Sequence, residues 1–134
     1  MPFTEKETVY LRSRHIGRLA TVGPDGRPHN VPVGFRLNDD GTIDITGRDL
    51  GRSRKYRDVA EQPAVSFVVD DIAGTDPWVA RGIEIRGRAA ALATGGRAHN
   101  PNLAEELIRI TPERIVAWGV DASWQEGTNS RDVD

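Results

Sequence analysis

Short apolar runs that alternate with period two, each closed by a turn signal, constrain the fold of this chain most strongly. The stretch HNVPVGFRL shows the pattern well, because every second residue is apolar: Val31, Val33, Phe35 and Leu37. Such spacing places these side chains on one face of a half-buried β-strand. After the turn signal NDDG, the stretch TIDIT alternates again, with Ile43 and Ile45 on the inward face.

Comparable runs recur along the chain, and together they predict seven strands. The predicted strands are residues 16–22, 29–37, 42–46, 64–70, 82–92, 106–111 and 114–120. The last two are separated only by Pro112 and Glu113. A capping box at Thr4 and Glu7 predicts a short helix to about Arg14. Since no βαβ rhythm is present, the pattern predicts a mainly β protein, either an antiparallel barrel or a sandwich.

Length and composition limit the domain count and the class of protein. The 134 residues suit a single domain, predicted over residues 1–126, and the polar residues 127–134 predict a flexible tail. The chain has no cysteine, which excludes disulfides and a thiol nucleophile. No apolar run is long enough for a signal peptide or a membrane span. We therefore expect a soluble, cytoplasmic protein without a membrane partner.

The segment GRSRKYRDV carries four cations although the formal net charge of the chain is −2. Ser53 is a candidate N-cap, so Arg54 and Lys55 fall in the first turn of a predicted helix, where the macrodipole is already positive. An anion such as phosphate would turn this unfavourable placement into a favourable one. The alternative is a solvated face, with Arg54 and Arg57 paired to the acids four residues later.

Three neighbouring features favour a ligand beside this segment. Pro32 and Gly34 leave one face of their strand bare, although an edge strand also accepts proline. Thr46 and Gly47 end the next strand just before the basic segment. Trp78 offers an indole for stacking, although a single tryptophan more often packs in a core or a dimer contact.

The residues SRKYRDVAEQPAVSF resemble the phosphate-binding segment of the pyridoxamine 5′-phosphate oxidase-like flavoproteins. IGRLATVGPDGRPHNVPVGF resembles the first hairpin of that superfamily, and RGIEIRGRA and IRITPERIVAWGV resemble the later strands of its actinobacterial, deazaflavin-dependent branch. The resemblance implies an FMN-binding split β-barrel and a homodimer with cofactors between the subunits. It assigns the phosphate to Ser53, Arg54 and Lys55, assisted by Arg52 or Arg57. It assigns the cofactor ring and its side chain to Val31, Pro32, Val33, Thr46 and Gly47, with Trp78 from the same or the other subunit.

Departures from the family pattern refine the expected activity. The chain lacks the basic, tryptophan-containing ending of true pyridoxamine phosphate oxidases, which argues against vitamin B6 chemistry. Its arginine-rich, lysine-poor composition fits actinobacteria, in which coenzyme F420 is common, and its WG ending resembles the same branch of the family. This resemblance implies hydride transfer from reduced F420 to a conjugated small-molecule acceptor. An FMN-dependent oxidase and a non-catalytic flavin- or haem-binding protein stay open.

Other site classes have little support in the sequence. We identify no catalytic residue, because no nucleophile has a base beside it in the sequence. His15, His29 and His99 are too scattered to indicate a metal site. We expect no nucleic-acid partner, because the cations form one short segment without an aromatic platform.

Overall fold

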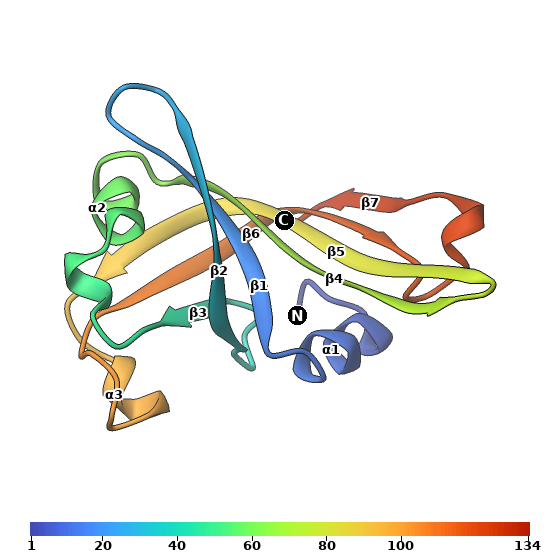
Figure 1. Ribbon diagram of the computed structural model, residues 1–134, viewed down its shortest axis with the longest axis horizontal. Helices are drawn as coiled ribbons and strands as arrows, with labels where there is room; N and C mark the ends of the chain where they lie inside the picture. Colours follow the sequence, from blue (N-terminus) through green and yellow to red (C-terminus); the bar gives the residue numbers. More distant parts are fainter.

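The computed structural model describes residues 1–134 and contains seven strands and several short helices (Figure 1). The strands are β1 (Ile16–Val22), β2 (Pro28–Leu37), β3 (Ile43–Thr46), β4 (Ala64–Thr75), β5 (Trp78–Leu92), β6 (Leu107–Trp118) and β7 (Asn129–Asp132). The α-helices are α1 (Glu5–Arg12), α2 (Arg54–Glu61) and α3 (Gly96–His99), and two 3-10 turns are η1 (Leu50–Arg52) and η2 (Trp124–Glu126). No helix combines the length and the apolar character needed to cross a membrane.

The strands form one antiparallel sheet that closes on itself. Their order is β3-β2-β1-β4-β5-β6-β7, and β3 pairs additionally with β6, so the first six strands form a barrel. In Figure 1, α2 and the β1–β2 hairpin lie at one end, whereas the β4–β5 hairpin extends away at the other. The structure confirms the predicted mainly β, split-barrel fold.

The alternating runs supply the core. Ile43 and Ile45 are fully buried as predicted, and Val33 and Leu37 of β2 are also buried. Val31 differs, because its side chain is 37% exposed although it follows the same alternation. The reason is that β3 pairs only with residues 34–37 of β2, so the earlier part of β2, residues 28–32, projects beyond the packed core. This projecting part lies next to α2.

The predicted break at Pro112 and Glu113 is wrong, because β6 runs through it as one strand. β5 pairs with β6 along its length, with a register shift between Arg86 and Gly87. Arg86 lies opposite Arg114 and Gly87 opposite Pro112, so Glu113 is the extra residue of a β-bulge. A bulge accommodates proline without ending the strand, and the PE signal was therefore mistaken for a turn.

The C-terminal segment also differs from the prediction of a flexible tail. Asn129–Asp132 forms β7, which pairs with β6 from Arg114 to Ala117. Arg131 donates hydrogen bonds to the fully buried carboxylate of Glu7 and to the backbone oxygen of Pro2 (2.9 Å). A segment poor in apolar residues is thus ordered by backbone pairing and by one buried charge that needs a partner.

Candidate cofactor-binding site

The basic segment forms the start of α2, as the sequence predicts. Ser53 is the N-cap, with extended backbone angles (φ −75°, ψ 154°). Its hydroxyl accepts a hydrogen bond from the Tyr56 backbone N–H (3.4 Å) and donates one to the Leu50 carbonyl (2.6 Å). The backbone N–H groups of Arg54 and Lys55 have no acceptor within the helix, because they precede its first complete turn. This end of α2 can therefore bind an anion.

The cations of α2 have no anionic partner within the protein. The first turn of α2 holds no acidic residue, and neither Arg54, Lys55 nor Arg57 forms a salt bridge. The pairing of Arg54 with Asp58 that a solvated face would show is absent, because Asp58 points inward and is buried. The structure therefore favours the anion site over the solvated face.

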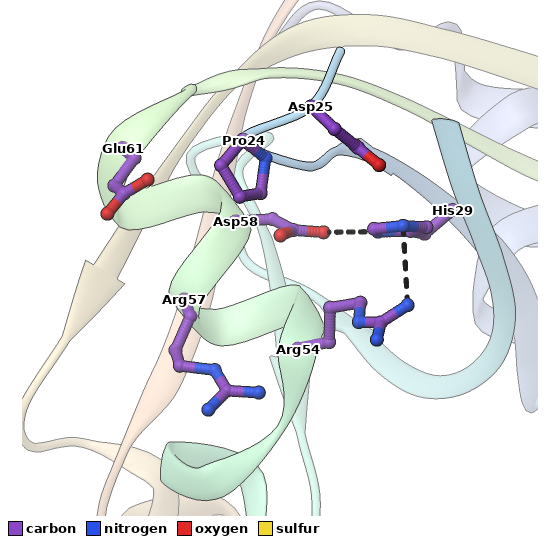
Figure 2. A pocket seen from close by; sticks show the side chains of 7 residues that line it. All are labelled: Pro24, Asp25, His29, Arg54, Arg57, Asp58 and Glu61. Atoms are coloured by element: carbon purple, nitrogen blue, oxygen red, sulfur yellow. Dashed lines mark hydrogen bonds and ion pairs between the residues drawn. The ribbon is translucent and has the colours of Figure 1, made fainter. Parts of the chain in front are cut away.

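Asp58 connects α2 to the β1–β2 hairpin (Figure 2). Its Oδ2 accepts hydrogen bonds from the Thr21 hydroxyl (2.7 Å) and from Nδ1 of His29 (2.8 Å). Burial alone would raise the pKa of Asp58, but the bonds from His29 and Thr21 outweigh it and hold the pKa below its ordinary value. On the other side of the imidazole, Nη1 of Arg54 lies 3.4 Å from His29 Nε2.

Two adjoining cavities follow this connection and share His29 and Arg54. One, of about 320 Å³, is lined by Thr21, His29, Asn30, Val31, Arg54 and Lys55. The other, of about 380 Å³, is lined by the residues of Figure 2: Pro24, Asp25, His29, Arg54, Arg57, Asp58 and Glu61. The structure thus brings together Val31, Arg54 and Lys55 from the predicted set, with Arg57 next to them.

The other predicted residues of this end do not line these cavities. Pro32 is exposed on β2, whereas the Val33 side chain is buried in the core, so only the backbone of Val33 is available to a ligand. Thr46 ends β3 opposite Gly34, and the carbonyl of the next residue, Gly47, accepts from Ala104 N–H (3.1 Å). Arg52 points outward and is 3.9 Å from Asp49.

Trp78 does not join this site within one chain. It begins the fifteen-residue strand β5, whose last residue, Leu92, accepts a hydrogen bond from the Tyr56 hydroxyl of α2 (3.0 Å). At about 3.3 Å per residue, the two ends of β5 are roughly 45 Å apart along the strand. Trp78 is 51% exposed at the far hairpin, so only a second subunit would bring it to a cofactor beside α2.

Sequence reasoning missed His29 and Asp58 as site residues. His29 lies on the part of β2 that pairs only with β1, directly opposite Thr21. The turn signal GPDG lies between β1 and β2 and indicates that the two strands pair as a hairpin. This pairing is the signal that could have placed Thr21 and His29 side by side. Asp58 gave no such signal, because its inward direction depends on how α2 packs on the hairpin.

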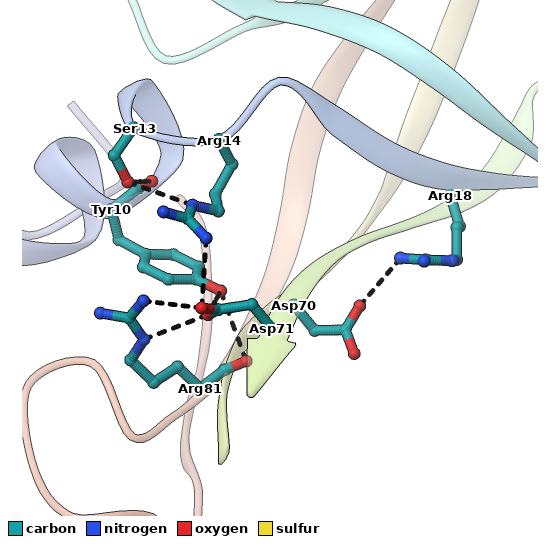
Figure 3. A network of polar contacts seen from close by, with 7 residues as sticks. All are labelled: Tyr10, Ser13, Arg14, Arg18, Asp70, Asp71 and Arg81. Atoms are coloured by element: carbon teal, nitrogen blue, oxygen red, sulfur yellow. Dashed lines mark hydrogen bonds and ion pairs between the residues drawn. The ribbon is translucent and has the colours of Figure 1, made fainter. Parts of the chain in front are cut away.

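A second charged cluster lies at α1 and contrasts with the first (Figure 3). Asp71 accepts hydrogen bonds from the Tyr10 hydroxyl (2.6 Å), from Arg81 Nε and Nη2 (3.1 and 2.7 Å) and from Arg14 Nη1 (3.1 Å). The bonds from Arg81 are the main reason that the pKa of Asp71 lies below its ordinary value. Both guanidinium groups also lie over the Tyr10 ring.

A third cluster holds the short helix α3 against the barrel. The buried carboxylate of Asp44 accepts from Arg109 Nε (2.8 Å) and from His99 Nε2 (2.7 Å). His99 is therefore part of a structural ion-pair cluster. No group of three or more potential metal ligands occurs in the chain.

The residues at the start of α2 fit a phosphate-bearing cofactor such as FMN or F420. Two backbone N–H groups without an acceptor lie there, Arg54 and Lys55 line the same cavity, and Asn30 and Val31 of β2 border it. These groups provide charge and hydrogen-bond donors for a phosphate, and an open strand for a flat ring.

Comparison with known proteins agrees with this arrangement. Residues 3–119 match the family model described as pyridoxamine 5′-phosphate oxidase. The chain is 55% identical over 134 residues to the 5a,11a-dehydrotetracycline/5a,11a-dehydrooxytetracycline reductase of Streptomyces rimosus, covering 99% of this chain and 94% of that protein.

Solved structures share the fold. Conserved hypothetical protein Rv2991 from Mycobacterium tuberculosis aligns with a TM-score of 0.73 at 22% identity, over 98% of this chain and 92% of that one. A haem-binding protein from Mycobacterium smegmatis aligns with a TM-score of 0.72 at 18% identity, over 96% of this chain and 57% of that one. An FAD-binding protein from Mesorhizobium loti aligns with a TM-score of 0.66 at 19% identity, over 86% of this chain and 94% of that one. With the family model matched over nearly the whole barrel, the chain belongs to the pyridoxamine 5′-phosphate oxidase family.

Proposed function

We propose that this protein is a reductase that uses reduced coenzyme F420 to reduce a conjugated, polycyclic acceptor of the dehydrotetracycline type. The observation that carries the proposal is the 55% identity, over 99% of the chain, to a reductase of 5a,11a-dehydrotetracycline. The matched region includes β2 and the start of α2, where the candidate cofactor site lies. The unneutralised cations of α2 support a cofactor with a phosphate group.

The residues of the site would bind and orient the cofactor. Ser53 fixes the start of α2, so that the N–H groups of Arg54 and Lys55 face the phosphate together with both cationic side chains. Thr46, Gly47 and the exposed part of β2, including Pro32, would border the ring. When bound, reduced F420 supplies the hydride. The second hydrogen would arrive as a proton from water, and we assign no catalytic residue.

A homodimer would complete this site. Several large apolar side chains are exposed on the strands: Ile16 (56%), Ile72 (42%), Trp78 (51%) and Val79 (36%). A second subunit would cover such side chains, and it would carry Trp78 from the far hairpin towards a cofactor beside α2. We place the protein in the cytoplasm, where reduced cofactors are available.

FMN is the alternative cofactor, because it presents a phosphate to the same site. Arg57 is available in the adjoining cavity for the longer anionic tail of F420, but Asp25 and Glu61 line the same cavity, so its charge does not distinguish F420 from FMN. An FMN-dependent oxidase or a non-catalytic flavin- or haem-binding protein would use the same barrel without reducing a tetracycline-type acceptor.

The test is a titration of the purified protein with F420 and, separately, with FMN, followed by quenching of tryptophan fluorescence. Lys55→Ala should weaken F420 binding about tenfold or more, because a charge-assisted contact to phosphate is lost. Lys6→Ala removes the only other lysine, on α1, and should leave the affinity unchanged.

Turnover then separates the candidate functions. Reduced F420 should be oxidised in the presence of 5a,11a-dehydrotetracycline, and the oxidation can be followed by the change in F420 absorbance. At low cofactor concentration, the Lys55→Ala variant should not show this change. Binding of FMN alone would favour the oxidase, and tight binding without turnover would favour a carrier. Binding of neither cofactor would refute the proposal.

A further inference from the structure

Binding of an anion requires the long Arg54 side chain to be ordered, and the neighbouring His29 can reduce the cost of this ordering. The Arg54 side chain is exposed and forms no salt bridge, so without a neighbour to hold it the guanidinium would sample many rotamers. Ordering a long cationic side chain on binding costs up to about 2 kcal/mol of side-chain entropy. A neighbour that holds the guanidinium in place before the anion arrives reduces that cost.

The partners of the imidazole determine which of its nitrogens carries hydrogen. An ionised carboxylate can only accept, so Nδ1 of His29, 2.8 Å from Asp58 Oδ2, must be protonated. A guanidinium can only donate, so Nε2, 3.4 Å from Arg54 Nη1, must be unprotonated. Only the neutral imidazole with hydrogen on Nδ1 satisfies both contacts, because in the imidazolium form an N–H would face the arginine.

The contacts form a chain that becomes more exposed from the core to the anion site. The Asp58 side chain is 3% exposed and the His29 side chain 24%, and Arg54 lies at the surface. Thr21, opposite His29 in the hairpin, donates to the same oxygen of Asp58 and fixes the carboxylate. Each side chain is thus held by a more deeply buried one (Figure 2).

We propose that His29 is a positioning residue, which accepts a hydrogen bond from Arg54 and holds the guanidinium beside the anion site, while Asp58 and Thr21 hold His29. The identification of the anion as a cofactor phosphate rests on the proposed function. The positioning itself concerns only residues of the free protein. It can therefore be tested with and without cofactor.

Two amide substitutions separate positioning from structural support. His29→Asn keeps a donor near the position of Nδ1, towards Asp58, but has no acceptor for Arg54. His29→Gln places an amide oxygen near the position of Nε2, towards Arg54, but weakens the contact with Asp58. Positioning predicts that His29→Asn weakens F420 binding about tenfold and His29→Gln only about twofold. A merely structural role predicts the opposite order, and that order would overturn the proposal.

A double substitution tests whether His29 acts through Arg54. In an Arg54→Ala background, His29→Asn should change the F420 affinity by less than about twofold, because no guanidinium is left to position. Full additivity of the two changes would contradict the inference. The same measurements with FMN serve if FMN is the cofactor that binds.

If neither cofactor binds, nuclear magnetic resonance of the free protein tests whether His29 positions Arg54. The ¹⁵N imidazole spectrum at pH 8 should show hydrogen on Nδ1 of His29 and a bare Nε2. The Arg54 Nε–H group should be ordered in the wild type and in His29→Gln but mobile in His29→Asn. Hydrogen on Nε2, or equal mobility in all three proteins, would overturn the positioning role, whereas failure of cofactor binding alone would overturn only the proposed function.

Discussion

Each of two regions of this barrel combines an aspartate with several cations, but the regions differ in whether these cations have an anionic partner within the protein. At α1, the Asp71 carboxylate receives hydrogen bonds from two arginines and a tyrosine, so the cations are neutralised within the protein. At α2, Oδ2 of Asp58 accepts from Thr21 and His29, and the neighbouring cations have no anionic partner. The abundance of arginine therefore does not identify a binding site. What distinguishes the proposed site is that its cations gather at the start of one helix, α2, without an anionic partner.

The comparison predicts that the Asp71 cluster contributes to stability and not to binding. Asp71→Ala should lower the free energy of unfolding by about 2 kcal/mol, because it leaves Tyr10 and two guanidinium groups without their acceptor. This figure allows for the arginines being about one-third exposed. Urea denaturation measures the change, and the F420 affinity should stay as in the wild type.

The adjacent Asp70 provides the matched control for that change. It forms an exposed ion pair with Arg18 (3.0 Å), so Asp70→Ala should cost no more than about 0.5 kcal/mol. Equal losses for Asp70→Ala and Asp71→Ala would show that the α1 cluster is an ordinary set of surface charges.

Low pH should remove the contribution that Asp58 and Asp71 make to the free energy of unfolding, so both regions can be tested in one experiment. The pKa values of Asp58 and Asp71 are lower in the folded protein than the ordinary value of 3.8. A lowered folded pKa stabilises the protein above the unfolded pKa, and this stability is lost as the pH falls through the folded pKa. Stability should therefore decrease below about pH 4, and less steeply in Asp58→Asn and Asp71→Asn. Urea midpoints between pH 5 and pH 2.5 would test this, and unchanged slopes in both variants would contradict it.

Salt should weaken the α2 site more than it weakens the α1 cluster. Raising the ionic strength from about 0.05 to 0.5 M should reduce F420 affinity about threefold, because exposed cations are screened. The difference in stability between wild type and Asp71→Ala should change little, since its partly buried pairs are less accessible to ions. Fluorescence titration and urea denaturation in the two buffers give both values. A salt-independent affinity would mean that the cations of α2 do not contact the ligand.

The smallest effect concerns the free protein. Lys55→Ala should raise the free energy of unfolding by a few tenths of a kcal/mol, because a cation at a helix N-terminus opposes the macrodipole. Saturating F420 should reverse the order, so that the wild type becomes more stable than the variant. Thermal melts with and without F420 would show this crossing. A variant less stable than the wild type without ligand would indicate that Lys55 has an internal partner.

The local features of the fold could be predicted from sequence, and the long-range ones could not. Ser53 as the cap of α2 and the burial of Ile43 and Ile45 follow from neighbouring residues, and the structure confirms them. The continuity of β6 across Pro112 depends on the register with β5, which the sequence of β6 alone does not contain. β7 forms only because β6 and Glu7 offer it partners.

The candidate site divides in the same way. The cations of α2 were predicted from charge and capping, and Val31 lines a cavity with Arg54 and Lys55. The distance of Trp78 from α2 follows from the length of β5, and the direction of Asp58 follows from the packing of α2 on the hairpin. Both are tertiary properties, for which a single sequence gave no signal.

The projecting part of β2 has a consequence for edge-to-edge aggregation of the molecule. An unpaired strand edge is a template for edge-to-edge association and aggregation. Along this edge, Pro28 and Pro32 lack the N–H group that an incoming strand would need, and proline is accommodated where that position faces away from the neighbouring strand. The edge therefore stays accessible to a small ligand, while it is a poor template for extending the sheet into a neighbouring molecule.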